Sequence, residues 1–232
     1  MKEKYTDLEL NELDYKKAVI YDKRTYCQYY CSLIIKKELL LFTFYNKLDY
    51  NLTQIKISLF LFTFSLYFAI DGFFFSDDTM NKIYTDNGEY DLIYQIPQLI
   101  YSLFLSILIN ALLKSLSLTD KQFLSIKLEK NSFLLKERAT KIRKIIKIKI
   151  VVFYLISFLG MFFFWYFISC FCAVYKNTQK LLIYDTLISF GISLLYPFVL
   201  YLIPGIFRIL SLRAPKKDRN IMYFIGNFLA II

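Results

Sequence analysis

The stretch over residues 119–175 most constrains what this chain can fold into. It begins as a charged run, TDKQFLSIKLEKNSFLLKERATKIRKIIKIKI, and continues without a glycine or proline break into VVFYLISFLGMFFFWYFISCFCAVY. The second part is apolar and long enough for a helix that crosses a bilayer, which needs about 20 residues. Together with three further apolar blocks, it predicts a multi-span membrane protein.

Four apolar blocks define the expected architecture, an all-α integral membrane fold with four transmembrane helices. We place the spans at about residues 55–75, 96–116, 150–172 and 182–210. Composition agrees, because 57% of the 232 residues are hydrophobic, more than soluble domains usually carry. Little chain is left for a separate soluble core, so we expect one membrane domain over residues 51–232.

Residues 1–50 form the expected cytoplasmic N-terminal segment. Residues 1–21 are polar and weakly patterned, and we expect them to be mobile or to depend on a partner for order. An amphipathic helix should follow, which either lies in the membrane interface or packs on the cytosolic end of the bundle. Its apolar stripe at helical spacing consists of Tyr26, Tyr30, Leu33, Ile34, Leu40, Leu41 and Phe44.

A long basic helix is predicted between spans two and three. Residues 119–149 hold ten Lys and Arg against three acids, with an apolar stripe of helical period. Thr119 and Gln122 fit a capping box, and we expect one helix that extends about 45 Å into the cytoplasm before it continues into span three. The residues expected to contact lipid headgroups or a protein partner are Lys136, Arg138, Lys141, Arg143, Lys144 and Lys147.

Prolines and glycines indicate where the spans are irregular. Pro97 falls in the first turn of the predicted span two, where its missing N–H has no cost. Span four contains Gly191, Pro197, Pro204 and Gly205, so we expect a kink or break in its second half. The last 12 residues are too few to span and should pack on the bundle or lie in the interface.

Charge next to the spans predicts which side of the membrane each loop faces. The N-terminal flank, residues 119–149 and the C-terminal flank are basic, whereas residues 76–91 hold five acids and one lysine. Lys and Arg beside spans face the cytoplasm, so both termini are expected there. Topology and anionic lipid therefore explain the net charge of +10 better than nucleic acid does.

The residue types present exclude several kinds of active site. The chain has no histidine, which removes the most common general base and the histidine metal sites. Its four cysteines form two close pairs, which the predicted topology places on opposite sides of the membrane. Cys27 and Cys31 are either palmitoylated or, more simply, buried thiols. We expect no metal, no cofactor and no enzymatic activity.

Polar residues within the spans define a second candidate site, which is either a polar pathway or a packing surface. Two acids lie near the outer ends of spans one and four, where Lys176 and Lys180 could neutralise them. Small and polar residues recur at four-residue spacing on one face of span two, which is typical of helix packing and of a hydrated pore. Without a charge at mid-depth, packing is favoured. The site residues are Asp71, Ser106, Asn110 and Asp185.

Several segments resemble a C-terminal membrane module of uncharacterised multi-pass proteins from single-celled eukaryotes. They are FWYFISCFCAVYKNTQ, DTLISFGISLLYPFVLYLIPGIFRI (185–209), YDKRTYCQYY (21–30) and IYQIPQLIYS (93–102). The resemblance covers most of the chain after residue 20. It implies a membrane fold and a relation to proteins that carry an extra N-terminal region. No activity is assigned to that family, so no functional residue carries over.

Two functions remain open from the sequence. The first is a membrane anchor, scaffold or accessory subunit, whose partners are membrane lipids and either another protein or further copies of the chain. The alternative is a homo-oligomeric ion channel or transporter. A membrane enzyme would need a cluster of titratable groups in one cavity, which the sequence does not provide.

Overall fold

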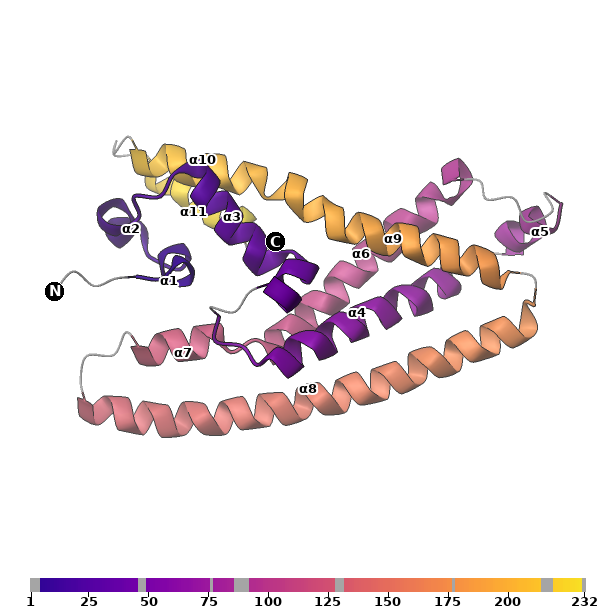
Figure 1. The fold of residues 1–232 in the computed structure, drawn as a ribbon, viewed down its shortest axis with the longest axis horizontal. Coiled ribbons are helices and arrows are strands. Elements are labelled where there is room, and N and C mark those ends of the chain that lie inside the picture. Colours follow the sequence, from indigo (N-terminus) through magenta and orange to yellow (C-terminus); the bar gives the residue numbers. More distant parts are fainter. Residues whose placement is uncertain are drawn as a thin grey trace. The chain divides into compact units, whose positions relative to one another are not determined.

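The computed structural model describes residues 5–45, 49–75, 77–85, 92–127, 132–176, 178–213 and 219–230, and within them the chain forms helices and no strands (Figure 1). It divides into two compact units, Tyr50–Ser193 and the paired terminal segments Met1–Asp49 and Leu194–Ile232. The helices are α1 (Asp7–Asn11), α2 (Tyr15–Tyr21), α3 (Tyr26–Lys37), the π-helical turn η1 (Leu41–Tyr45), α4 (Thr53–Phe74), α5 (Asp77–Thr85), α6 (Leu92–Ser117), α7 (Asp120–Lys127), α8 (Ser132–Val174), α9 (Gln179–Leu200), α10 (Leu202–Arg213) and α11 (Arg219–Leu229).

Four helical segments are long and apolar enough to cross a membrane, as the sequence predicts. They are built on α4, α6, α8 and the consecutive helices α9 and α10. In the unit Tyr50–Ser193, α4 packs against both α6 and α8. Of the residues in its most apolar stretch, 56% are buried, against 11% for α8, so α4 lies at the centre of this unit.

Aromatic rings fill the contact between α4 and α8. The Phe62 ring meets Phe164 edge to face, with the ring centroids 5.2 Å apart, an orientation that aromatic pairs favour. A Cβ atom added at Gly160 would lie 2.7 Å from Cε2 of Phe62. The absence of a side chain at Gly160 therefore allows α4 and α8 to approach closely.

The prediction of one helix from residue 119 into span three is wrong in its first part. α7 is a separate helix that packs against α8. Lys149 Nζ donates to the Leu118 carbonyl at 3.1 Å, so residues 31 apart in sequence are neighbours and the chain has turned back. α8 is nevertheless unbroken for 43 residues, about 65 Å at 1.5 Å per residue.

Long-range hydrogen bonds replace the predicted capping box at Thr119 and Gln122. The Thr119 hydroxyl donates to the Tyr50 carbonyl at 2.9 Å, and the Thr119 N–H donates to Asn51 Oδ1 at 2.9 Å. Asp120 Oδ1 accepts from the Tyr50 N–H at 3.1 Å and from the Asn51 side chain at 3.0 Å. These bonds fasten the start of α7 to the start of α4.

The prolines act as expected at one position and not at the other. α9 ends at Leu200 and α10 begins at Leu202, which confirms the break predicted in span four. Pro204 has no N–H to donate to the Leu200 carbonyl, which explains the interruption there. α6 begins earlier than predicted, so Pro97 lies inside the helix rather than in its first turn.

The terminal segments form the second unit, in which α3 packs against α10. Tyr29, Leu33 and Ile34 form a buried cluster with Tyr201 and Ile209. The amphipathic segment is therefore packed on another helix, one of its two predicted positions. The segment is shorter than its predicted stripe, because α3 ends at Lys37 and a π-helical turn follows.

Residues 5–21 are more ordered than predicted, because they contain α1 and α2. α1 begins with a capping box in which the side chains of Thr6 and Glu9 each accept from the other's backbone N–H. At the other terminus, α11 packs against α10, as one of the two alternatives for the final residues predicts. A Cβ atom added at Gly226 would lie 3.2 Å from the backbone nitrogen of Arg208 and 3.3 Å from the carbonyl oxygen of Pro204.

We predict that Gly226→Ala destabilises the protein, because the added methyl group meets backbone atoms that cannot move aside. Overpacking of this kind costs about 1–3 kcal/mol, which should be visible as a lower thermal unfolding midpoint in detergent. Gly191→Ala is the matched control, because a Cβ atom there meets nothing within 4 Å and alanine favours helix. Equal effects of both substitutions would contradict the tight contact between α10 and α11.

Candidate functional site

Polar side chains form a stripe along one face of α6, within the unit Tyr50–Ser193. Gln95, Gln98, Ser102 and Ser106 are buried, and Asn110 continues the series. Positions three or four residues apart lie on the same face of a helix, so the stripe extends for about 22 Å. The sequence prediction named Ser106 and Asn110 and missed both glutamines, although their spacing extends the same pattern.

Two fully buried acids lie at one end of this stripe, Asp71 on α4 and Asp185 on α9. The Ser189 hydroxyl donates to Asp71 Oδ2 at 2.7 Å. The Gln98 amide joins the two acids, because it donates to Asp185 Oδ2 and to the backbone carbonyl of Asp71, the latter at 3.3 Å. With its amide oriented to satisfy both groups, Gln95 donates to the two Asp185 carboxylate oxygens at 3.2 and 3.3 Å.

Two oxygen atoms next to these bonds have no hydrogen-bond partner among the described residues, Asp71 Oδ1 and Thr186 Oγ1. Both side chains are fully buried. The hydroxyls of Thr186 and Ser102 lie close enough to the Asp71 carboxylate to interact with it. Buried polar atoms almost always have a partner, so the surroundings of Asp71 retain unused bonding capacity. We call Asp71, Gln95, Gln98, Ser102, Asp185, Thr186 and Ser189 the carboxylate cluster.

The polar stripe continues away from the carboxylate cluster. Ser106 is fully buried and its hydroxyl has no partner in the described part of the chain. Beyond it, the Thr63 hydroxyl of α4 donates to Asn110 Oδ1 at 2.9 Å. Hydrogen bonds therefore place Asp71 and Asn110 at the contact between α4 and α6, and Ser106 is buried on α6 between these two levels.

The predicted neutralisation of Asp71 by lysines is wrong, because no ion pair to Asp71 exists among the described residues. Lys176 and Lys180 are exposed, whereas Asp71 and Asp185 are both fully buried. Sequence position places Asp71 and Asp185 near the ends of their spans, but tertiary packing encloses both. The sequence prediction did not include Thr186 and Ser189. Ser189 follows Asp185 by four residues, which places the two on the same face of α9.

The basic residues named from the sequence lie on the first third of α8. Lys136, Arg138, Lys141, Arg143, Lys144 and Lys147 are all exposed. Four apolar positions at helical spacing are half-buried, namely Leu135, Ala139, Ile142 and Ile146, whereas Ile145 is exposed. α8 therefore separates a charged face from an apolar face in this region, as its periodicity predicts.

A separate polar cluster holds the unit of the terminal segments together, and the sequence analysis missed it. Arg208 of α10 is fully buried, and its guanidinium forms an ion pair with Asp22 at 3.2 Å. The same group donates to Asn227 Oδ1 at 2.7 Å and to the carbonyls of Leu10 and Asn11. Arg208 thereby connects α1, the end of α2 and α11 to α10.

Aromatic rings and a second arginine complete the surroundings of Arg208. The guanidinium carbon of Arg208 lies 4.9 Å from the ring centroids of both Tyr29 and Tyr223, within the range of cation–π attraction. Arg24 binds Asp22 with two hydrogen bonds of 2.8 and 2.9 Å. Arg208 lies at the end of the predicted fourth span, so from the sequence it was counted with the basic residues of the C-terminal flank.

Burial alone would raise the pKa of Asp22, but hydrogen bonds and charge from Arg24 and Arg208 outweigh burial and hold that pKa below 3.8. A carboxylate whose pKa is lowered by folding stabilises the fold above its unfolded-state pKa. That contribution is lost as the pH falls through the lower, folded-state pKa. Asp22 should therefore stabilise the protein at neutral pH and cease to do so in acid below about pH 4.

We predict that Asp22→Asn lowers the free energy of unfolding at pH 7 by about 3 kcal/mol, because it leaves Arg208 buried without its counter-charge. The difference from the wild type should shrink as the pH falls from 5 towards 3. Asp14→Asn is the control, because Asp14 is exposed and makes no side-chain capping bond. A wild-type advantage that does not depend on pH would contradict this role of Asp22.

The described residues contain no group of three or more acidic or cysteine side chains that could hold a metal ion. The interpretation of Cys27 and Cys31 as buried thiols is wrong, because both are free and exposed. Both belong to α3, which uses its opposite face, with Tyr29 and Leu33, for packing.

Comparison with protein-family models, with curated proteins and with solved structures found no match to this chain.

Proposed function

We propose that the protein is an integral membrane anchor, scaffold or accessory subunit whose basic α8 segment contacts anionic lipid headgroups on the cytoplasmic side. One observation carries this proposal: α8 exposes cations along its first third and apolar side chains along the remainder. A single continuous helix with these two surfaces fits the boundary between headgroups and hydrocarbon.

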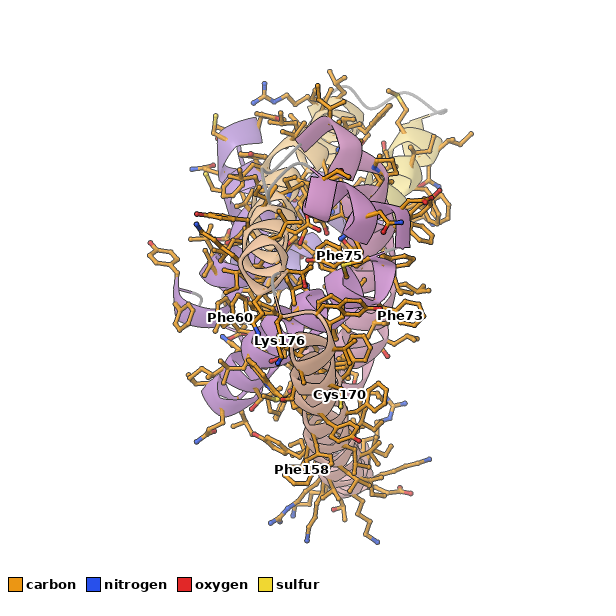
Figure 2. The ribbon with its side chains drawn as sticks, turned by 90° about the vertical axis from the view of Figure 1, so that its right-hand side faces the viewer. Phe60, Phe73, Phe75, Phe158, Cys170 and Lys176 are labelled. Carbon is orange, nitrogen blue, oxygen red and sulfur yellow. The ribbon has the colours of Figure 1, made fainter. Side chains whose placement is uncertain are left out.

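The apolar part of α8 supports insertion into lipid. Its exposed large side chains include Val151, Leu155, Phe158 and Phe162, and Phe158 has 70% of its surface exposed. Figure 2 shows side chains, Phe158 among them, spreading outward around this helix. Monomeric soluble proteins rarely expose an apolar surface of this extent, whereas lipid covers it at no cost. A helix of a partner protein or of another copy of the chain could cover part of the same surface.

The charge of the loops supports an orientation in which both termini are cytoplasmic. The basic part of α8 forms the start of the third candidate span, on the side where the chain arrives from the second, and acidic residues lie between the first and second. By the positive-inside rule these two regions belong on opposite sides of the membrane. Four spans then return the C-terminus to the side of the N-terminus.

We predict that replacing Lys141, Arg143, Lys144 and Lys147 with Glu removes a preference of the protein for anionic lipid. Each cation near a membrane surface contributes about 1 kcal/mol of attraction, so four reversals should reduce the preference at least tenfold. The measurement is the ratio of phosphatidylserine to phosphatidylcholine that co-purifies from mixed micelles. Lys176→Glu with Lys180→Glu is the control at the other end of α8. An unchanged ratio in the fourfold variant would contradict the proposal.

The carboxylate cluster favours a second candidate function, the binding or movement of a small cation across the membrane. Acids within membrane spans are rare, and they commonly mark ion pathways or proton relays. Asp71 and Asp185 are fully buried on two of the candidate spans, and the polar stripe of α6 extends away from them. Binding or moving a cation requires a site within the protein where the cation is held.

A further inference from the structure

We propose that Asp71 is the charged ligand of a binding site for a monovalent alkali cation, completed by the hydroxyls of Ser102, Thr186 and Ser189. The site specifies the ligand of the second candidate function above and rests on it. It does not depend on the lipid contacts of α8, which involve different residues.

The first step concerns the charge of Asp71. Its side chain is fully buried, and the described residues provide no ion pair for it. Oδ2 accepts a hydrogen bond from Ser189, and Oδ1 has no partner. A buried carboxylate with one hydrogen bond is costly unless a proton or a cation neutralises it. Arg24 and Arg208 provide that charge for Asp22 in the other unit, and Asp71 has no equivalent.

The second step concerns the atoms around Asp71. Ser102, Thr186 and Ser189 are buried, and all three hydroxyls lie near the carboxylate. A hydroxyl has one hydrogen to donate and keeps two lone pairs as an acceptor. Ser102 donates its hydrogen to the Leu99 carbonyl at 3.1 Å, and Thr186 Oγ1 has no partner. These oxygen atoms can therefore act as neutral ligands, and oxygen ligands select hard cations.

The third step concerns the charge that the site can accept. The nearby Asp185 carboxylate receives amide N–H groups from Gln98 and Gln95. Two amide groups therefore donate hydrogen bonds to the Asp185 carboxylate, whereas no amide of the described residues donates to the Asp71 carboxylate. The described part of the chain has no group of three acidic or cysteine side chains placed to hold one metal ion, whereas protein sites for Ca²⁺ usually combine several carboxylates. One available carboxylate with neutral oxygens matches a single positive charge.

The test is thermal unfolding of the purified full chain in detergent at pH 8. The salts are sodium chloride, potassium chloride and choline chloride at one ionic strength. A cation that binds only the folded state raises the unfolding midpoint. We expect Na⁺ or K⁺ to raise it by roughly 2–4 °C over choline at 100 mM. The salt that acts at lower concentration identifies the preferred ion.

Two variants assign the effect to the site. Asp71→Asn keeps the shape of the side chain and removes its charge, so we expect the alkali-specific shift to disappear. Ser193→Ala is the control, because Ser193 lies farther along α9 and its hydroxyl donates to the Phe190 carbonyl at 2.6 Å. This control should keep the full shift. Thr186→Val should weaken the apparent affinity for the cation at least fivefold, because it removes an unpartnered oxygen that is one of the proposed ligands.

The proposal is overturned if alkali salts and choline give the same midpoint in the wild type, or if Asp71→Asn keeps the full shift. A pH-dependent midpoint without an alkali-specific effect also overturns it, because Asp71 would then hold a proton. None of these results bears on the preference of α8 for anionic lipid, so the two proposals fail separately.

Discussion

A polar group that leaves water must find a partner within the protein, and this constraint organises both units of the chain. In the unit of the terminal segments, Arg208 meets it with an ion pair to Asp22, hydrogen bonds to Asn227 and to two backbone carbonyls, and contacts with two tyrosine rings. Three elements that are distant in sequence, α1, the end of α2 and α3, converge on this one side chain together with the following helix α11. Their apolar contacts, such as that of Tyr29 with Ile209, surround the same point.

The other unit meets the constraint less completely. Asp185 receives two glutamine amides, while Asp71 keeps one oxygen without a partner among the described residues. A cluster that served stability alone would be more stable with a hydrogen-bond partner for that oxygen. In the Arg208 cluster, nearly every polar side-chain atom has such a partner. Unsatisfied groups persist at positions where a protein binds or moves something. This difference between the two units is the physical reason to look for a ligand at Asp71 and for a structural role at Asp22.

The sequence was sufficient for the helical class and for the four long apolar helices, because each span depends on local composition. The break after Leu200 was also predictable, since proline acts within its own helix. The reversal between α7 and α8 was not, because contacts such as that of Lys149 with Leu118 join residues far apart in sequence. The Arg208 cluster could not be predicted for the same reason, because its members also lie far apart in sequence. A buried arginine and a flanking arginine look alike until the partners that enclose one of them are known.

The candidate site was predictable in part. Asp71 and Asp185 were named because acids within apolar spans are conspicuous, but their enclosure depends on α4, α6 and α9 together. Gln98, which joins the two acids, lies near the end of its span. Polar residues are common there, so Gln98 did not stand out in the sequence. Helical spacing from Ser102 back to Gln98 and Gln95 was the available signal. Sequence position alone also suggested Lys176 and Lys180 as counter-charges, and their side chains remain exposed.

Membrane topology is the central claim of this account, and labelling of single cysteines tests it most directly. The four native cysteines would be replaced by serine, and Lys141→Cys or Asp78→Cys introduced at exposed positions. In sealed vesicles whose cytoplasmic face is outward, a membrane-impermeant maleimide should label Lys141→Cys at once. It should label Asp78→Cys only after detergent is added. Labelling of both positions in sealed vesicles, or of Asp78→Cys alone, would contradict the proposed orientation.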